Sequence, residues 1–207
     1  IIGLKMGLTS QAKMRQMNVF EPIYGHLFDD MPVEDGGVIR LSELIHPRVE
    51  LEIAFILGRD LSGPGVTAAH VMAATQYVLP ALEIIDSRYE AFKFTLPDVI
   101  ADNASSSRLV LGSTLTPPHK QELDVAGATL HINGELVDLG AGAAVLGHPA
   151  NAVAKLANML SRRGEGLKAG QIILSGGITG AASLKGGDFV RARIAGLGEV
   201  SFSVVEQ

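Results

Sequence analysis

The sequence predicts an α+β domain that is mostly β, with a mixed, rolled or sandwich-like sheet and a few peripheral helices. Three observations lead to this prediction. About nine or ten short runs of β-branched or alternating apolar residues are separated by turn residues. Only three segments show helical spacing of apolar residues, and they lie far apart. The chain has 207 residues, 47% of them hydrophobic and 19% charged, which is enough for one substantial core.

In the first half of the chain, the pattern predicts four strands and two short helices. The strands cover residues 1–7, 38–41, 46–57 and 78–86. Thr9-Ser10 is a helix-start signal for residues 10–17, and Thr67 is an N-cap candidate for an alanine-rich helix over residues 67–75. Residues 21–25 are predicted as a turn or extended segment, and residues 29–37 as a polar, glycine-rich loop.

In the second half, strands are predicted over residues 108–112 and 171–174, together with two hairpins. Asn133-Gly134 divides the first hairpin, residues 128–137, and favours a type I′ turn. Residues 188–194 and 199–205 alternate around a Gly-Leu-Gly turn and form the closing hairpin. Between the hairpins, His148-Pro149 opens an amphipathic helix that ends near residue 162, with Gly164 as its C-cap.

Composition and charge argue against several classes of protein. The formal net charge is −5 with no basic cluster, which disfavours nucleic acid as the main partner. The absence of cysteine excludes disulfides, thiolate metal sites and a cysteine nucleophile. No apolar run approaches the roughly 18 residues of a membrane span and no signal peptide is visible, so we expect a cytoplasmic protein without a membrane partner. The chain begins without Met, so we expect a further segment before Ile1.

Three glutamates are the strongest candidates for a functional site. Glu50 and Glu52 lie two residues apart in a predicted strand, so their side chains project to the same face. Glu83 stands inside an apolar strand, where an acid is rarely buried without a partner. Three carboxylates from two strands would suit Mg²⁺ or Mn²⁺. The alternative is that Glu50 and Glu52 face solvent on a half-exposed strand.

Other polar positions have two interpretations each. Lys5 in the first strand is either solvated or part of a site. Arg88 either binds an anionic ligand or pairs with Asp86 or Glu90. The small, polar run at residues 101–107 and the glycine-rich turn at residues 175–180 each present hydroxyls and backbone N–H groups to a ligand, or are ordinary connections.

Five stretches form a recognisable set: residues 3–10 (GLKMGLTS), 46–54 (HPRVELEIA), 82–88 (LEIIDSR), 101–105 (ADNAS) and 146–149 (LGHP). Together they resemble the fumarylacetoacetate hydrolase-like superfamily, in its hydratase/decarboxylase branch of meta-cleavage aromatic degradation. The resemblance covers essentially the whole chain. The resemblance implies the C-terminal-domain fold of that superfamily, and we expect residues 1–207 to form a single catalytic domain. By resemblance, we expect the family's N-terminal segment, partly helical, to precede Ile1.

The resemblance also implies roles for individual residues. Glu50, Glu52 and Glu83 match the family's metal ligands, for Mg²⁺ or Mn²⁺, and Lys5 matches its active-site lysine. The turn with Ser175, Gly176, Gly177 and Thr179 is our candidate for binding the substrate carboxylate, and Arg88, Asp102 and Ser105 are further substrate-binding candidates.

Two sister activities of the branch remain open at this point. One is the decarboxylation of 2-oxo-3-hexenedioate, and the other is the hydration of 2-hydroxypenta-2,4-dienoate. Residues 86–94 (DSRYEAFKF) and the absence of Trp and Cys resemble the decarboxylases. A C–C hydrolase and a non-catalytic binding subunit are weaker alternatives. We expect a 2-oxo dicarboxylate substrate, a homo-oligomer and, as a possible partner, the hydratase of the same pathway.

Overall fold

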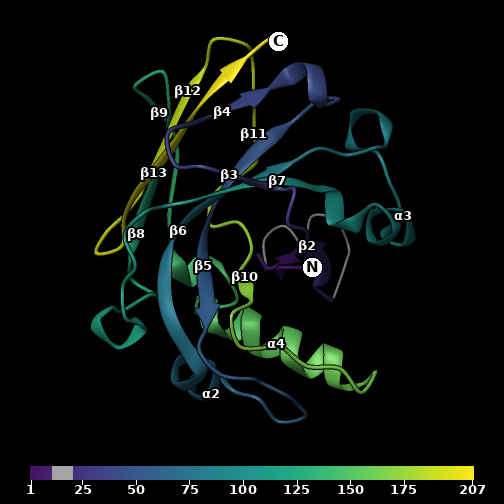
Figure 1. Cartoon of the computed structure of the whole chain (residues 1–207), viewed down its shortest axis with the longest axis vertical. Coiled ribbons are helices and arrows are strands. Elements are labelled where there is room, and N and C mark those ends of the chain that lie inside the picture. The colour runs from purple at the N-terminus through teal and green to yellow at the C-terminus, as the bar shows by residue number, and fades with distance from the viewer. Residues whose placement is uncertain (11–20) are drawn as a thin grey trace.

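Two β-sheets form the framework of the computed structural model, which describes residues 1–10 and 21–207 (Figure 1). The strands of the first sheet are β1 (Gly3–Gly7), β2 (Ile23–Leu27), β3 (Pro32–Val33), β5 (Arg48–Leu57), β6 (Thr75–Ile85), β7 (Ser106–Leu111), β10 (Ile172–Leu174) and β11 (Ala182–Ser183). The strands of the second sheet are β4 (Gly37–Arg40), β8 (Gly127–Ile132), β9 (Glu135–Ala141), β12 (Phe189–Ile194) and β13 (Gly198–Val205).

The first sheet runs in the order β2-β1-β10-β5-β6-β7-β3, with β11 beside β5, and the second in the order β4-β13-β12-β8-β9. Most neighbours are antiparallel, but β1 with β10, β3 with β7 and β4 with β13 are parallel. The sheets are therefore mixed, and the prediction of a mostly-β α+β fold with rolled sheets is confirmed.

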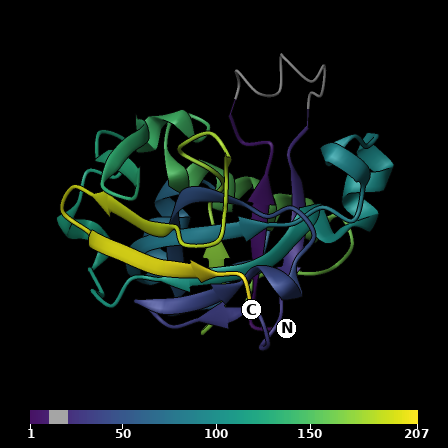
Figure 2. The same ribbon diagram turned by 90° about the horizontal axis from the view of Figure 1, so that it is seen from above.

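The long antiparallel pair β5–β6 stands at the centre of the first sheet. Val49, Leu51, Ile53 and Phe55 alternate along β5 and are fully buried in the main core. The second sheet contributes Phe202 and its neighbours to the same core, and Figure 2 shows the C-terminal strands, in yellow, layered beside the teal strands. Because side chains alternate along a strand, residues 50 and 52 are turned away from this core. The main core thus fixes which face of β5 carries the glutamates.

Three α-helices lie among the described residues: α2 (Ala68–Ala74), α3 (Leu96–Ala101) and α4 (Pro149–Ser161). The apolar side of α4, including Val153, Leu156 and Leu160, is buried against the main core. Gly164 has φ +73° just past this helix, as a glycine C-cap requires. The helix predicted over residues 67–75 is observed, and all but the first residue of the one predicted over residues 10–17 lies outside the described residues.

Two parts of the secondary structure differ from the predictions. The structure has thirteen strands in its described residues instead of about nine or ten. Two extra strands, β3 and β11, have two residues each, which is too short for an alternating pattern. Residues 21–25 contribute to a full strand, β2. Helix α3 was not predicted, although Thr95 and Asp98 form a capping box at its start.

Within the residues that the structure describes, no helix is both long enough and apolar enough to span a membrane.

The cap of α4 makes stability depend on pH. His148 is the N-cap, and its Nδ1 accepts a hydrogen bond from the Ala150 N–H at 3.0 Å. Burial lowers the pKa of His148 below its usual value near 6.5, partly offset by Asp124. The folded state therefore favours neutral imidazole, and the unfolded chain takes up the proton first as pH falls. We expect this contribution to be complete above pH 6.5 and to be lost as pH falls through the folded pKa.

Urea unfolding at pH 7.5 and 5.5 tests this, with His148→Asn as the matched variant because asparagine caps helices without titrating. Between pH 7.5 and 5.5 we expect the unfolding free energy of the wild type to fall by more than that of the variant. The difference should be at most the contribution of one N-cap, about 1 kcal/mol. The same loss in both proteins would show that the His148 cap does not titrate in this range.

Candidate functional site

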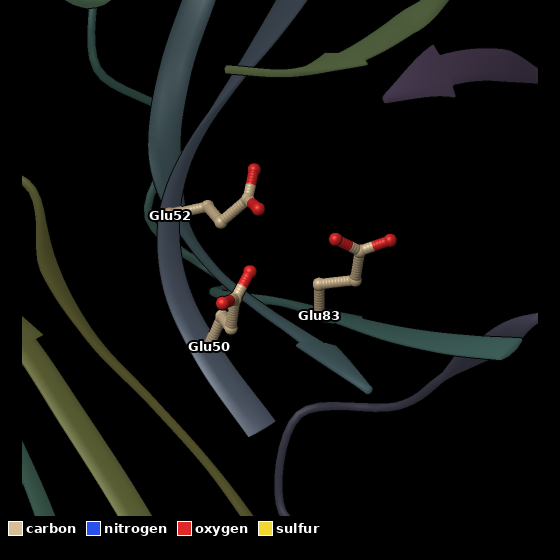
Figure 3. Close-up of side chains that lie close together, drawn as sticks. All are labelled: Glu50, Glu52 and Glu83. Atoms are coloured by element: carbon tan, nitrogen blue, oxygen red, sulfur yellow. The ribbon is translucent and has the colours of Figure 1, made fainter. Parts of the chain in front are cut away.

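Three glutamates of the central strand pair point into one space. Glu50 of β5 stands directly opposite Glu83 of β6, and Glu52 follows two residues along β5. One carboxylate oxygen from each lies within 4.8 Å of the others, and Figure 3 shows the three side chains directed toward one another. Glu52 and Glu83 are 0% exposed, and Glu50 is half-buried. The solvent-facing alternative is therefore wrong for this cluster.

Lys5 enters the same cluster from β1. Its Nζ lies 2.9 Å from Glu83 Oε2, and the lysine is 3% exposed, so its solvated alternative is wrong. The second oxygen of Glu83 accepts a hydrogen bond from Ser106 Oγ at 2.9 Å. Both Glu83 oxygens thus have a partner within the protein. This ion pair joins β1 to β6, two strands that are not neighbours in the sheet.

The glycine-rich turn after β10 completes the cluster through its backbone. Ser175 N–H donates to Ile53 O at 3.1 Å and Ile178 N–H donates to Leu51 O at 2.8 Å, so the turn still pairs with β5 at both ends. Between these bonds the chain bulges, and the Gly176 N–H donates to Glu52 Oε2 at 2.7 Å. Gly176 has φ +103°, a conformation that favours glycine. In a regular strand this backbone N–H would bond to β5. In the bulge it bonds to the Glu52 carboxylate instead.

Burial and mutual charge set the protonation of the cluster. Burial alone would lower the pKa of the Lys5 ammonium, but the carboxylates, Glu83 first, outweigh it and raise that pKa. Burial, and next the charge of Glu83, raise the pKa of Glu52 well above its usual value, against the opposing effects of Lys5 and the Gly176 N–H. Without a further cation, the cluster favours a protonated Glu52 and a charged Lys5.

The cluster fits a divalent cation. Three carboxylates and one ammonium leave two negative charges in a mostly buried space when all four groups are ionised. Glu52 Oε1 is buried and has no hydrogen-bond partner, so one donor oxygen is unsatisfied. All the candidate donors are carboxylate oxygens, which Mg²⁺ and Mn²⁺ prefer. A bound divalent cation would neutralise the cluster and satisfy this oxygen.

A cavity of about 340 Å³ opens beside the cluster, a size that suits a small-molecule ligand. Lys5, Glu50 and Gly177 lie on its lining and form its charged end. The remaining lining includes an apolar wall of five residues: Leu8, Ile23, Phe94, Val99 and Ala104. It also includes four hydroxyl residues: Thr9, Ser10, Thr95 and Ser105.

The structure brings only part of the predicted substrate-binding set to this cavity. Ser105 and Gly177 line it. Ser175, Gly176 and Thr179 are buried behind it, and the Thr179 hydroxyl accepts a hydrogen bond from Leu51 N–H at 3.2 Å. The Gly176 N–H is taken by Glu52, so the carboxylate that this turn binds in the structure is the protein's own.

Arg88 and Asp102 lie outside the cavity lining, in a network behind it. The Asp102 carboxylate accepts hydrogen bonds from Ser105 Oγ at 2.9 Å and from Ser87 Oγ at 3.2 Å. Arg88 forms its ion pair with Asp102 at 3.3 Å, and its side chain is 51% exposed. The predicted pairing of Arg88 with Asp86 or Glu90 is wrong, because the Asp86 carboxylate binds two backbone N–H groups of residues 45 and 46.

Sequence reasoning missed most of the cavity wall. The segment from Phe92 to Val99, which includes the start of helix α3, supplies part of the lining. Asn103, Ala104 and Ser105 form a left-handed turn, with φ between 53° and 58°, on the lining or next to it. The Asn103 side chain pairs with both the N–H and the C=O of His26, at 2.7 and 2.9 Å, and ties this turn to β2. The capping box at Thr95 was the available signal for α3.

Known proteins are similar to this chain in sequence and in fold. The family described as the C-terminal domain of fumarylacetoacetate (FAA) hydrolase matches residues 7–205. The chain belongs to this family. It is 53% identical over 201 residues to a 4-oxalocrotonate decarboxylase of Pseudomonas sp. (strain CF600), covering 97% of this chain and 76% of that relative.

Two further relatives bear on the activity. A 2-keto-4-pentenoate hydratase of Paraburkholderia xenovorans (strain LB400) is 46% identical over 200 residues, covering 97% of this chain and 74% of that protein. The solved structure of 4-oxalocrotonate decarboxylase from Pseudomonas putida G7, complexed with magnesium and adipate, is 51% identical with a TM-score of 0.96. It covers 99% of this chain and 78% of that one. Both sister activities of the branch therefore occur among similar proteins.

Gly177 leaves room for the Glu50 carboxylate. A Cβ at this position would lie 2.9 Å from Glu50 Oε2, so Gly177→Ala must displace that side chain. We expect Mn²⁺ affinity, measured by calorimetry, to fall by about tenfold or more, as it does when a ligand loses its support. Gly127→Ala is the control, because nothing lies within 4 Å of its Cβ position. Equal affinity in both variants would contradict a ligand role for Glu50.

Lys5 balances charge in the buried cluster. Lys5→Met keeps the aliphatic stem but leaves Glu83 without its ion-pair partner, and we expect a loss of roughly 3 kcal/mol in the unfolding free energy of the metal-free protein. Adding Glu83→Gln should restore part of the loss. Urea unfolding measures both effects, and an unchanged stability in Lys5→Met would refute the role of the pair.

Proposed function

We propose that this chain, as a single catalytic domain, converts 2-oxo-3-hexenedioate (4-oxalocrotonate) to 2-hydroxypenta-2,4-dienoate and CO₂. The observation that carries the proposal is the buried cluster of Glu50, Glu52, Glu83 and Lys5, which meets a cavity of small-molecule size. The similarity to 4-oxalocrotonate decarboxylases, one of them complexed with magnesium and adipate, supports this substrate class. By resemblance we place the reaction in meta-cleavage degradation of aromatic compounds.

The three glutamates would hold the cofactor, Mg²⁺ or Mn²⁺. When bound, this cation supplies a Lewis acid beside the 2-oxo acid end of the substrate. The protein supplies the rest of the charged end. The Gly176 N–H fixes the Glu52 carboxylate, and Ser106 and Lys5 fix that of Glu83. These bonds position the ligand oxygens before the substrate arrives, as a catalytic metal site requires.

Lys5 has the electrostatic role in the proposed reaction. The bond between the distal carboxylate and the adjacent carbon breaks, and its electron pair moves through the conjugated chain to the 2-oxo oxygen. CO₂ leaves, and the oxygen takes up one proton to give the dienol. The Lys5 Nζ lies 2.9 Å from Glu83 Oε2 and on the cavity lining, so its ammonium presents positive charge to the bound substrate. That charge favours the electron-rich oxygen that develops in the transition state.

Hydration of 2-hydroxypenta-2,4-dienoate is the second candidate, because hydratases are similar to this chain at 46% identity. Hydration needs a general acid and base that deliver water and protonate carbon. A C–C hydrolase would need a positioned histidine base, and none occurs among the described residues that line the cavity. A non-catalytic binding subunit would have no need for three clustered carboxylates, two of them fully buried.

We also propose a homo-oligomer, with a complex with the pathway's hydratase as a further possible assembly. Strand β9 supports the oligomer, because it is the edge of the second sheet and exposes Leu136, Val137 and Leu139. Exposed apolar edge strands are places where chains associate. The cytoplasm remains our proposed location, on the basis of the sequence alone.

The activity test uses 2-oxo-3-hexenedioate with and without Mg²⁺ and follows both CO₂ release and the dienol absorbance. We expect metal-dependent CO₂ release. Glu52→Gln should lower its rate by at least about 100-fold, because a ligand charge worth several kcal/mol is lost. Glu135→Gln, at an exposed position on β9, is the matched control and should retain full activity.

The outcomes separate the candidates. Hydration of 2-hydroxypenta-2,4-dienoate without CO₂ release would assign the sister activity and keep the metal site. Full activity and full metal affinity in Glu52→Gln would refute the ligand assignment. Inactivity on both substrates would leave the binding-subunit alternative.

A further inference from the structure

The cavity has two chemically different ends. At the charged end, Lys5 and Glu50 lie on the lining, with Glu52 and Glu83 directed toward the same space in Figure 3. The apolar wall defined above forms a small hydrophobic cluster of its own, separate from the main core. All five of its members also line the cavity. An apolar cluster that lines a cavity, instead of filling the space between the sheets, is placed to contact a ligand.

Two cations among the described residues lie near the apolar side, and both interact with groups other than the cavity. Phe92, which also lines the cavity, stacks on His46 with ring centroids 4.7 Å apart, and the Arg48 guanidinium lies 4.2 Å from the centre of the Phe92 ring. Arg88 pairs with Asp102 behind the wall. Among the described residues that line the cavity, Lys5 is the only cation. The positive charge that the described residues bring to the cavity lining therefore lies beside the carboxylate cluster.

We infer that the apolar wall receives the distal carboxylate of the substrate and promotes its loss as CO₂. This inference rests on the proposed decarboxylase function. With the 2-oxo acid end at the glutamates and Lys5, the carbon chain extends toward Leu8, Phe94 and Val99. The wall is thus a specificity-determining surface, selective for substrates whose distal group becomes neutral during the reaction.

The direction of charge movement explains why such a wall helps. Before the reaction, the distal carboxylate carries a full negative charge, which apolar surroundings solvate poorly. As the carbon–carbon bond breaks, its electron pair moves to the 2-oxo oxygen near Lys5, and the carboxyl group becomes CO₂, which is neutral and apolar. The wall thus destabilises the negative charge on the distal carboxylate, and Lys5 stabilises the negative charge that develops on the 2-oxo oxygen. A cation at the wall would oppose the reaction by stabilising the carboxylate.

Binding of unreactive analogues tests the wall in the wild-type protein. The probes are 2-oxohexanedioate and 2-oxopentanoate, which share the 2-oxo acid end and differ in the distal carboxylate. Calorimetry with saturating Mg²⁺ measures both affinities. We expect 2-oxopentanoate to bind at least as tightly as 2-oxohexanedioate. The distal carboxylate of the latter would lose its hydration on binding and find no cation to pair with. Binding of the dicarboxylate more than about threefold tighter would reveal a cationic subsite and overturn the inference.

A polar substitution in the wall tests its effect on the reaction. Leu8 has φ +55°, a left-handed conformation that asparagine tolerates better than leucine, so Leu8→Asn changes polarity at nearly constant size. Its amide should stabilise the bound carboxylate. We expect kcat to fall by about tenfold while KM stays the same or decreases, the signature of reduced ground-state destabilisation. Leu146→Asn is the matched control, since Leu146 has φ +48° and lies outside the lining.

A second variant, Ala104→Ser, places a hydroxyl on the wall at another left-handed residue and should change kcat and KM in the same direction. Unchanged kcat in both wall variants, or a raised KM with unchanged kcat, would overturn the inference while leaving the decarboxylase standing. Failure of the wild type to release CO₂ would overturn the proposed function and, with it, this inference. Melting temperatures measured alongside identify any variant that fails to fold.

Discussion

The confinement of three carboxylates of the central strand pair with one ammonium from β1 is the constraint on which the rest of the site depends. Charges of this kind are stable away from water only when they are paired and hydrogen-bonded. The register of β5 and β6 sets Glu50 opposite Glu83, and β1 brings Lys5 within 2.9 Å of Glu83. The Gly176 bulge supplies a backbone N–H to Glu52. One oxygen of Glu52 still lacks a partner, which is the opening that a divalent cation would fill.

The cavity follows from how the chain closes around this cluster. The main core lies on one face of β5 and β6, so the glutamates project from the other face. On that side the chain leaves regular structure, and several residues adopt left-handed conformations. Leu8, Phe92, Ala104 and Ser105 all have positive φ and all line the cavity. Such strain persists only where the surroundings enforce it, and the Asn103 pairing with His26 is one such restraint. The charged end and the apolar wall together give the cavity a polarity that matches a substrate whose distal carboxylate loses its charge.

Much of the architecture could be predicted from the sequence, because long strands and the amphipathic helix repeat their pattern many times. The strand at residues 46–57 placed Glu50 and Glu52 on one face, and the structure has them there. Strands of two residues and the six-residue helix α3 carry too little pattern to detect. The apolar wall was missed for a different reason. Its members come from β2, α3, the segment just before α3 and two left-handed turns, and only tertiary contacts bring them together. The ion-pair partner of Arg88 was predicted wrongly because the observed partner, Asp102, is fourteen residues away in the sequence.

The central claim is that Glu50, Glu52 and Glu83 form one divalent-cation site. The most direct measurement is anomalous diffraction from crystals of the protein grown with Mn²⁺. The account predicts a single strong anomalous peak between the three carboxylates, which disappears in Glu83→Gln crystals grown in the same way. No peak at this position, or a peak only at some other cluster of acids, would contradict the account.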